Sequence, residues 1–454
     1  MQKKIKITFC GGAGSVTGAN FLIEVENKKI LVDCGLQQGT KMADEVNWQP
    51  FAYDAHSIDI LFVTHAHIDH LGRVPKLIED GFAGKIYSTL PTKALALPML
   101  EDTAFILGHN HELNLGEIYS DHNLKTALSL WEGFPYYEKT EITPELSFTL
   151  YNAGHILGSA MIAFDYNGKR ILFTGDLGNS PSPILPDTDK VENVDYLIME
   201  SVYGDRNHES RDERKKMLET VIEDNYKRKG TLMLPTFSLE RSQELLFELN
   251  DLVENKRIPM MPIFFDSPLA IRLTEIFKQF KDYFNENAQK AMVHDKYIFE
   301  FPGLKTTLKT EESKMIVNTP DPKVIIAGSG MSNGGRIVHH EKEYLPSAKN
   351  TLLLTGYQSA GTLGRLIQEG VKTVRIAGEE VKVKANIVTI LGYSGHKDSD
   401  GLVNFVSDMQ DTLQKVFVVM GEPKSSMFLV QKLKDNLGLD AVMPQEGDSI
   451  TLEL

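Results

Sequence analysis

The chain carries a dense group of potential metal ligands in the segment Thr64-His65-Ala66-His67-Ile68-Asp69-His70. Three of the 13 histidines of the chain and one aspartate fall between His65 and His70. Imidazole nitrogens and carboxylate oxygens are the ligands of zinc sites that lack cysteine. A lone histidine is usually a packed or surface residue, but four such ligands in so short a stretch indicate a metal site with room for two ions.

An apolar run, Ile58-Asp59-Ile60-Leu61-Phe62-Val63, directly precedes this segment and predicts a buried strand. His65 and His67 are two residues apart, so both side chains can point to the same side of an extended loop. Asp69 and His70 follow at a turn and can reach a second point nearby. The end of this strand is therefore expected to present two neighbouring groups of ligands.

Three positions elsewhere in the chain could complete such a site. His155 lies in the glycine-flanked stretch 152–160, where the backbone can approach a ligand closely. Asp176 ends an apolar run beside Gly175, and a carboxylate that closes a strand can bridge two cations. Asp33 also follows an apolar run and could accept a hydrogen bond that orients a ligand histidine.

The composition is typical of a globular protein and narrows its class. At 454 residues we expect two domains. No apolar run approaches the roughly 18–20 residues that a membrane span needs. The basic start lacks the apolar stretch of a signal peptide, and the two cysteines, Cys10 and Cys34, are too few for a disulfide framework or a cysteine zinc cluster. Together these features favour the cytoplasm and no membrane association.

The net charge of −14 argues against binding nucleic acid with the whole surface. It leaves open a local groove in which metal ions and a few basic side chains invert the potential.

Short strands and helices alternate through the second half of the chain. Apolar strand patterns occur at 231–235, 323–327 and 351–355, and leucines recur at helical spacing between Leu245 and Leu252. The recurring strand–loop–helix units after about residue 205 predict a parallel α/β domain.

The candidate ligands resemble the four successive motifs of the metallo-β-lactamase superfamily, namely Asp33, His65-x-His67-x-Asp69-His70, His155 and Asp176. The resemblance implies an α/β fold, an αββα sandwich with two zinc ions at one edge. It further implies that the first ion is held by His65, His67 and His155, and the second by Asp69 and His70, with Asp176 bridging the two.

Longer segments resemble the β-CASP nucleases over nearly the whole chain, in particular the bacterial and archaeal RNases related to the cleavage and polyadenylation endonuclease subunit. The matching segments are 200–208, 235–246, 266–270, 328–336 and 393–398, the last with Tyr393 and Gly395 in place of the usual Phe and Ala. This resemblance implies a discontinuous metallo-β-lactamase domain, 1–205 and 379–454, and an inserted β-CASP α/β cap, 206–378.

The function implied is that of a zinc-dependent ribonuclease that cuts single-stranded RNA internally, from the 5′ end, or both, in a cleft between the two domains. A hydroxide generated at the metals would attack phosphorus in line. Asp69 and Asp176 are expected to be catalytic through the metals, and Asp176 would orient the hydroxide. His396 would protonate the leaving oxygen, with Glu200 holding its imidazole.

A loop rich in small residues, Ser329–Arg336, is the best candidate for holding phosphate groups through its backbone N–H groups. A purely structural turn is the alternative interpretation. Ser329, Gly330 and Arg336 are therefore expected to bind substrate, as is Tyr357 in a similar glycine-containing loop.

One position departs from the pattern of RNA-directed relatives. Met420 stands where they have a histidine that completes the second metal shell, and a thioether is a poor zinc ligand beside carboxylates and imidazoles. The second zinc site is therefore expected to be the weaker one. DNA-directed members also lack this histidine, so a DNA or other phosphodiester hydrolase is an alternative. A non-catalytic RNA-processing partner subunit is another, although the intact ligands argue against it. Homodimers are common among relatives, but no residue pattern here identifies one.

Overall fold

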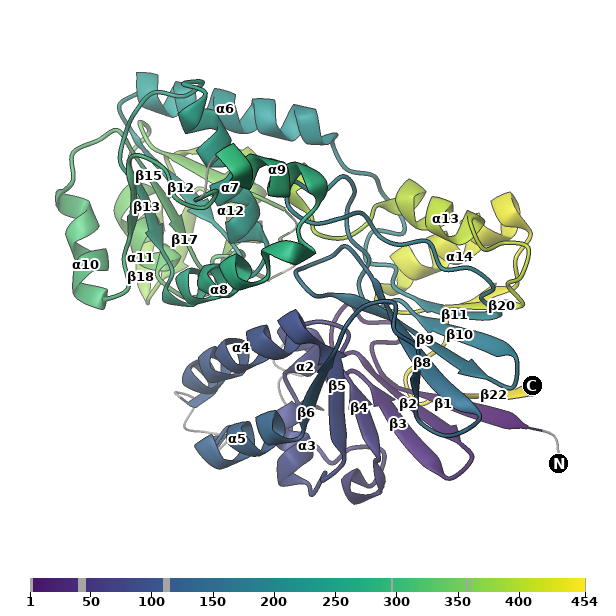
Figure 1. Ribbon diagram of the computed structural model, residues 1–454. Coiled ribbons are helices and arrows are strands. Elements are labelled where there is room, and N and C mark those ends of the chain that lie inside the picture. The colour runs from purple at the N-terminus through teal and green to yellow at the C-terminus, as the bar shows by residue number, and fades with distance from the viewer. Residues whose placement is uncertain are drawn as a thin grey trace. The chain divides into compact units, whose positions relative to one another are not determined.

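The computed structural model describes residues 3–39, 46–108, 115–294, 297–356, 358–359 and 361–453, which form two compact units (Figure 1). Unit 1 comprises Met1–Ser182, Pro186–Asn207 and His396–Leu454, and unit 2 comprises Pro183–Leu185 and His208–Gly395. The chain thus leaves unit 1, forms unit 2 and returns to unit 1. The domain boundaries expected from the sequence, 205/206 and 378/379, stay a prediction.

Two seven-stranded sheets form the centre of unit 1. The first has the order β22-β1-β2-β3-β4-β5-β6, with β1 (Lys4–Gly11), β2 (Asn20–Val25), β3 (Lys28–Val32), β4 (Ile60–Phe62), β5 (Lys85–Thr89), β6 (Trp131–Phe134) and β22 (Ser449–Glu453). The second has the order β21-β20-β11-β10-β9-β8-β7, with β7 (Thr140–Glu141), β8 (Leu146–Asn152), β9 (Ala160–Tyr166), β10 (Lys169–Phe173), β11 (Tyr196–Met199), β20 (Lys415–Val418) and β21 (Ala441–Val442).

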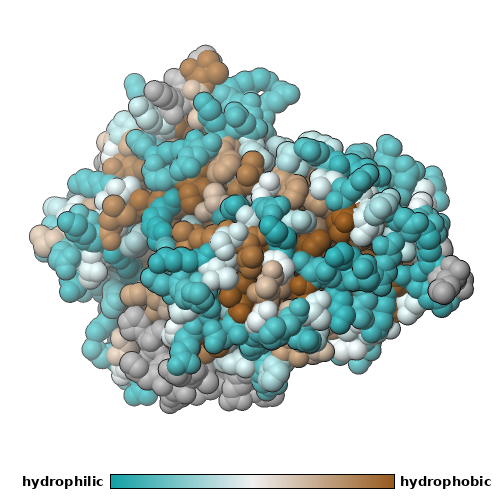
Figure 2. Space-filling view, turned by 60° about the horizontal axis from the view of Figure 1, so that its bottom comes forward, coloured by the Kyte–Doolittle hydropathy of each residue, from teal (hydrophilic) through white to brown (hydrophobic). Residues whose placement is uncertain are grey.

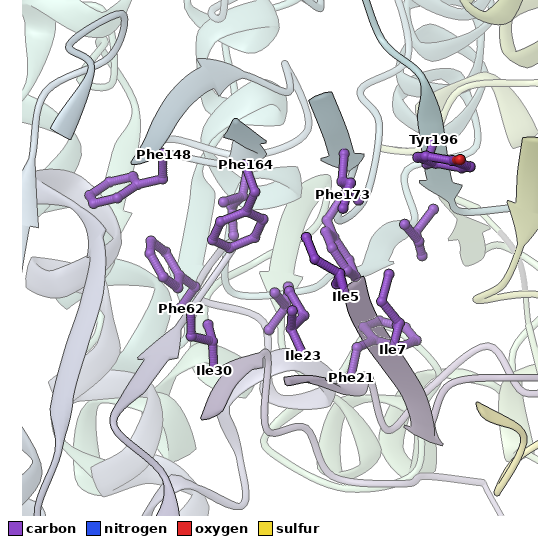
Figure 3. Close-up of a cluster of buried hydrophobic side chains, with 14 of the residues drawn as sticks. Ile5, Ile7, Phe21, Ile23, Ile30, Phe62, Phe148, Phe164, Phe173 and Tyr196 are labelled. Atoms are coloured by element: carbon purple, nitrogen blue, oxygen red, sulfur yellow. The ribbon is translucent and has the colours of Figure 1, made fainter. Parts of the chain in front are cut away.

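The core of unit 1 lies between these two sheets, as Figure 3 shows. In β1 the alternation of exposed and buried residues places Ile5, Ile7 and Phe9 on the inner face. The second sheet contributes Phe164, Phe173 and Phe417 to the same cluster, and the rings of Phe9 and Phe417 lie 5.9 Å apart. Each fully buried side chain of this size contributes about 1.5–3 kcal/mol, so this face holds the two sheets together.

Helices cover the outer faces and complete the αββα sandwich that the sequence predicts (Figure 1). Beside the first sheet lie α2 (Ile68–Leu71), α3 (Val74–Glu79), α4 (Leu90–Gly108) and α5 (Asp121–Ser129). Against the second sheet lie α13 (Ser399–Ser407) and α14 (Pro423–Leu437), whose buried Leu402 and Leu429 join a second apolar cluster with Leu172 and Leu197.

Parallel pairing brings the carboxyl ends of several strands of unit 1 to common edges. β4 pairs in parallel with β3 and β5, and β11 pairs in parallel with β10 and β20. The segments that follow β3 and β4 carry Asp33 and His65–His70, and those that follow β10 and β11 carry Asp176 and Glu200. The topology thus gathers the candidate site residues at strand ends.

Unit 2 is the parallel α/β domain that the alternating pattern predicts. Its six-stranded sheet has the order β14-β13-β15-β12-β16-β19, and every neighbouring pair is parallel. Its strands are β12 (Thr231–Pro235), β13 (Ile263–Asp266), β14 (Leu304–Thr306), β15 (Lys323–Ala327), β16 (Thr351–Leu354) and β19 (Asn386–Thr389), with a separate hairpin of β17 (Thr373–Ile376) and β18 (Glu379–Lys382). Its helices are α6 (Arg211–Lys227), α7 (Arg241–Glu254), α8 (Pro268–Gln279), α9 (Glu286–His294), α10 (Thr310–Met315), α11 (Ile337–Tyr344) and α12 (Leu363–Gln368).

Hydrophilic residues spread over much of the face shown in Figure 2, with hydrophobic side chains visible between them. Among the described helices, none is both long and apolar enough to span a bilayer.

Candidate metal centre

Three imidazoles from two distant segments converge in unit 1. The Nδ1 atom of His67 lies 3.1 Å from Nε2 of His65 and 3.2 Å from Nε2 of His155. Two nitrogens that each lie about 2.0–2.1 Å from one tetrahedral zinc ion are about 3.3 Å apart. The distances from His67 to the other two nitrogens therefore fit ligands of one tetrahedral zinc ion, and the three nitrogens lie within 4.8 Å of one another.

Asp176 joins this group to a second one through its two oxygens. Its Oδ2 atom lies 3.4 Å from Nε2 of His65 and 3.5 Å from Nε2 of His155. Its Oδ1 atom lies 3.3 Å from Nε2 of His70. A carboxylate whose two oxygens face two ligand groups has the geometry of a bridging ligand.

The second group consists of Asp69, His70 and Asp176, whose ligand atoms lie within 4.8 Å of one another. Nε2 of His70 and Oδ1 of Asp176 are buried, and neither finds a hydrogen-bond partner among the described residues. These two atoms face each other at 3.3 Å as an ion pair without hydrogen-bond geometry, and a cation held between them would satisfy both. The residues present therefore fit two cations that share Asp176.

The electrostatics of the site favour bound cations. Burial lowers the pKa of His65 and of His67 well below the usual value, which keeps these imidazoles in the neutral form that binds metal. Burial raises the pKa of Asp69 to about 6. Burial lowers the pKa of His70, but the neighbouring carboxylates of Asp176 and Asp33 outweigh it and raise that pKa well above the usual value. In the second group, Asp176 and Asp33 favour a protonated His70, and a bound metal ion would supply this positive charge in place of the proton.

A buried hydrogen-bond chain from Asp33 orients two of the histidines. Oδ2 of Asp33 accepts a hydrogen bond from Nδ1 of His70 at 2.7 Å, which leaves Nε2 of His70 for a metal. The Thr64 hydroxyl donates to Oδ2 of Asp33 at 2.9 Å and lies 3.0 Å from Nδ1 of His65, from which it can accept. Thr64 has no role in the sequence prediction, because nothing in the sequence marks a threonine that relays one carboxylate to a neighbouring imidazole.

Replacing Asp33 by Asn is expected to weaken zinc binding about 10- to 100-fold, because the amide no longer fixes the orientation of both histidines. Competition with a fluorescent zinc chelator measures the affinity. Asp59→Asn is the matched control, because Asp59 pairs with Lys28 at a position half-exposed to solvent. Equal zinc affinity in Asp33→Asn and the wild type would contradict the role of Asp33.

A second ionisable pair lies beside the ligands. Nδ1 of His396 lies 3.2 Å from Oε1 of Glu200 and 3.9 Å from Oδ2 of Asp176. The Glu200 carboxylate accepts hydrogen bonds from the N–H groups of Leu177 at 2.6 Å and Val202 at 3.3 Å, which fix its position. Burial opposes the charged imidazole, but Glu200 and Asp176 raise the pKa of His396 to about 9. The side chain of His396 is 24% exposed, so a proton on its ring can reach a bound molecule.

Comparison with known proteins decides the family. The family model of the metallo-beta-lactamase superfamily matches residues 14–225, that of the Beta-Casp domain matches residues 242–367, and that of the Zn-dependent metallo-hydrolase RNA specificity domain matches residues 380–444. Ribonuclease TTHA0252 of Thermus thermophilus is 33% identical over 98% of this chain and 100% of its own length. The chain belongs to the β-CASP branch of the metallo-β-lactamase superfamily. This β-CASP protein is thus a metal-dependent hydrolase, in agreement with the resemblance seen in the sequence.

Further comparisons find an RNase J-like protein, a transcription termination factor and a solved structure. The RNase J-like protein of Methanocaldococcus jannaschii is 31% identical over 98% of this chain and 99% of its own length. Transcription termination factor FttA of Methanosarcina mazei is 31% identical over 96% of this chain and 70% of its own length. A solved protein of unknown function from Enterococcus faecalis V583 covers 99% of this chain with a TM-score of 0.59 and 12% identity, which shows the shared fold alone.

Three of the residues predicted to bind substrate are Ser329, Gly330 and Tyr357, and the structure describes the hydrogen bonds of the first two. In the loop before α11, the Ser329 hydroxyl accepts a hydrogen bond from the N–H of Asn333 at 3.1 Å, and the carbonyl of Gly330 accepts one from the side chain of Gln358 at 3.1 Å. Tyr357 lies outside the described residues. The assignment of Ser329 and Gly330 to substrate therefore stays a prediction.

Arg336 is engaged inside unit 2. Its guanidinium donates to the Asp266 carboxylate at 2.7 Å and to the carbonyls of Thr307 and Leu308, each at 2.8 Å. It thereby ties the loop before α11 to β13 and to the segment after β14. The structure gives Arg336 this anchoring role, and its predicted contact with substrate stays untested.

The carboxylate of Asp266 that Arg336 pairs with is fully buried. Burial opposes ionisation, but hydrogen bonds from His340, Ser313, Thr307 and Arg336 lower its pKa to about 2. Because this pKa lies below the ordinary value, Asp266 stabilises the fold above about pH 4, and this contribution, about 2 kcal/mol, is lost as the pH falls towards 2. Denaturant unfolding of the wild type and Asp266→Asn should therefore differ at pH 6 and converge towards pH 2; a difference independent of pH would contradict this.

The side chain of Met420 lies in the apolar core of unit 1. It is 2% exposed and belongs to the apolar cluster between the two sheets. A Cβ added to Gly12 would lie 2.5 Å from its sulfur, so Gly12 leaves the space that this side chain fills. Met420 is therefore an apolar packing residue, and the second ligand group consists of Asp69, His70 and Asp176.

Proposed function

We propose that this β-CASP enzyme is a zinc-dependent ribonuclease that hydrolyses phosphodiester bonds of single-stranded RNA. The observation that carries the proposal is the pair of ligand groups that share Asp176, with the ionisable pair His396 and Glu200 directly beside them. The names of two relatives, a ribonuclease and an RNase J-like protein, support RNA as the substrate.

We assign the first zinc ion to His65, His67 and His155 and the second to Asp69 and His70, with Asp176 shared. When bound, two zinc ions supply Lewis-acid stabilisation of a phosphodiester and make a water molecule nucleophilic at neutral pH. The ligand set contains only nitrogen and carboxylate oxygen, and its nitrogen spacing matches tetrahedral zinc. The second site has fewer protein ligands and is expected to bind zinc more weakly.

The chain's own groups then handle the protons. Oδ2 of Asp176 faces the first ligand group and can hold the proton of the attacking water in the required orientation. His396 in its charged form donates a proton to the leaving oxygen, because Glu200 and Asp176 favour that form. Glu200 acts as a positioning residue, because its carboxylate holds Nδ1 of His396.

A DNA-directed or other phosphodiester hydrolase is the second candidate, and the observation that favours it is an apolar Met420 at the position where the resemblance to RNA-directed members calls for a histidine. RNA and DNA of the same sequence, each labelled in turn at the 5′ and 3′ ends, separate the two candidates. We expect RNA to be cut at least 100-fold faster than DNA, and the labelled products distinguish internal cuts from removal of 5′ nucleotides. Equal rates on RNA and DNA would overturn the ribonuclease proposal.

A further inference from the structure

Two loops of unit 2 meet at a point where the strand order of the parallel sheet reverses. β12 and β15 are neighbours, with Pro235 opposite Ala327 at their carboxyl ends. From β12 the chain crosses to β13 on one side, whereas from β15 it crosses to β16 on the other side. Because such crossovers are right-handed, the connection after β12 and the connection after β15 lie on opposite faces of the sheet. Parallel sheets commonly bind ligands in the crevice between two such connections, at the carboxyl ends of the strands.

An aromatic ring lies at this position. Phe237 follows β12, and the residue is 42% exposed. A Cβ added to Gly330, in the loop after β15, would lie 2.8, 2.9 and 3.0 Å from three atoms of the Phe237 ring. The ring is therefore seated on the bare backbone of Gly330 on one side and open to solvent on another.

Hydrogen bonds hold both parts of this arrangement. The carbonyl of Phe237 accepts a hydrogen bond from the Ser242 hydroxyl at 2.7 Å, at the start of α7. The carbonyl of Gly330 accepts one from the side chain of the buried Gln358 at 3.1 Å. These hydrogen bonds hold the backbone of Phe237 and of Gly330, and thereby the surface on which the exposed ring lies.

We propose that Phe237 is a stacking platform for one base of single-stranded RNA, a proposal that rests on the proposed function. Bases stack on aromatic side chains with little dependence on sequence, and stacking needs no neutralisation of phosphate charge. A chain with a net charge of −14 gains little from whole-surface attraction to phosphates, so a stacking contact is a suitable source of affinity. The hydroxyls of Ser238 and Ser267, 3.4 Å apart near Gly328, provide polar groups beside the platform.

The test compares Phe237→Leu with the wild type, because leucine keeps an apolar side chain over Gly330 but has no aromatic face. We expect the dissociation constant for a single-stranded oligoribonucleotide to rise about 5- to 100-fold, the range that stacking of one base provides. Phe237→Trp should bind as well as the wild type. Phe428→Leu is the matched control, because Phe428 on α14 is 49% exposed and should leave binding unchanged.

Two further measurements make the result specific. An oligoribonucleotide with 2-aminopurine at successive positions should show quenching at one position with the wild type and lose it with Phe237→Leu. An abasic site at that position should bind the wild type and Phe237→Leu equally.

Unchanged RNA binding by Phe237→Leu, or weaker binding that persists with the abasic RNA, overturns the platform. Failure of the wild type to cut RNA overturns the proposed function instead, and the binding measurements still decide the role of Phe237.

Discussion

Replacing Asp176 by Asn is expected to lower RNA hydrolysis by at least 10³-fold and to reduce the bound zinc. The two carboxylate oxygens face His65 and His155 on one side and His70 on the other, at 3.3–3.5 Å. The amide of asparagine is neutral and offers one oxygen, so it can serve one group at most. Loss of the several kcal/mol of charge stabilisation that a metal supplies corresponds to a rate loss of this size.

Zinc per chain, measured by mass spectrometry after gel filtration, provides a readout that is independent of activity. Asp176→Asn should retain less zinc than the wild type and lose the second, weaker ion first. Asp187→Asn is the control, because Asp187 is an exposed aspartate of unit 1. Full zinc content together with full activity in Asp176→Asn would rule out a shared ligand.

Replacing His396 by Ala is expected to lower turnover about 10²- to 10⁴-fold, the usual contribution of general acid–base catalysis, while the zinc content stays unchanged. His396 lies beside the ligands through Glu200 and Asp176 but belongs to neither of the two groups that we assign to zinc. Its loss should therefore remove a proton donor and leave the metals in place.

A substrate with a good leaving group distinguishes this role from a structural one. p-Nitrophenolate leaves without protonation, so a p-nitrophenyl phosphodiester should be hydrolysed by His396→Ala much closer to the wild-type rate than RNA is. Glu200→Gln should show the same selectivity to a smaller degree, and His122→Ala, at an exposed position of α5, should match the wild type. An equal loss on both substrates would argue against His396 as the acid.

Local patterns account for what the sequence predicts correctly. The apolar runs at 231–235 and 323–327 form β12 and β15 with the same bounds, because a fully buried parallel strand is marked by its own residues. The cluster His65–His70 is likewise local, and the motif resemblance supplies His155 and Asp176, which the fold brings to it.

Other features depend on partners far away in the chain and escape such patterns. Arg336 suits a phosphate ligand by its residue type, but its buried partner Asp266 lies 70 residues earlier. The side chain of Met420 packs into the space left by Gly12, which lies near the other end of the chain. The helix α6 is charge-rich and suggests a solvated surface, yet its Arg214 is buried against Glu248 of α7. In each case the sequence shows the residue but not the environment that decides its role.

Removal and return of zinc tests the central claim most directly. The purified enzyme is stripped with a chelator, and cleavage of end-labelled RNA is followed as zinc is added back in known ratios to the chain. The proposed site predicts no cleavage by the stripped enzyme and recovery that begins with the first equivalent and is complete only near the second. Cleavage that survives complete removal of metal would contradict a ribonuclease built on His65, His67, Asp69, His70, His155 and Asp176.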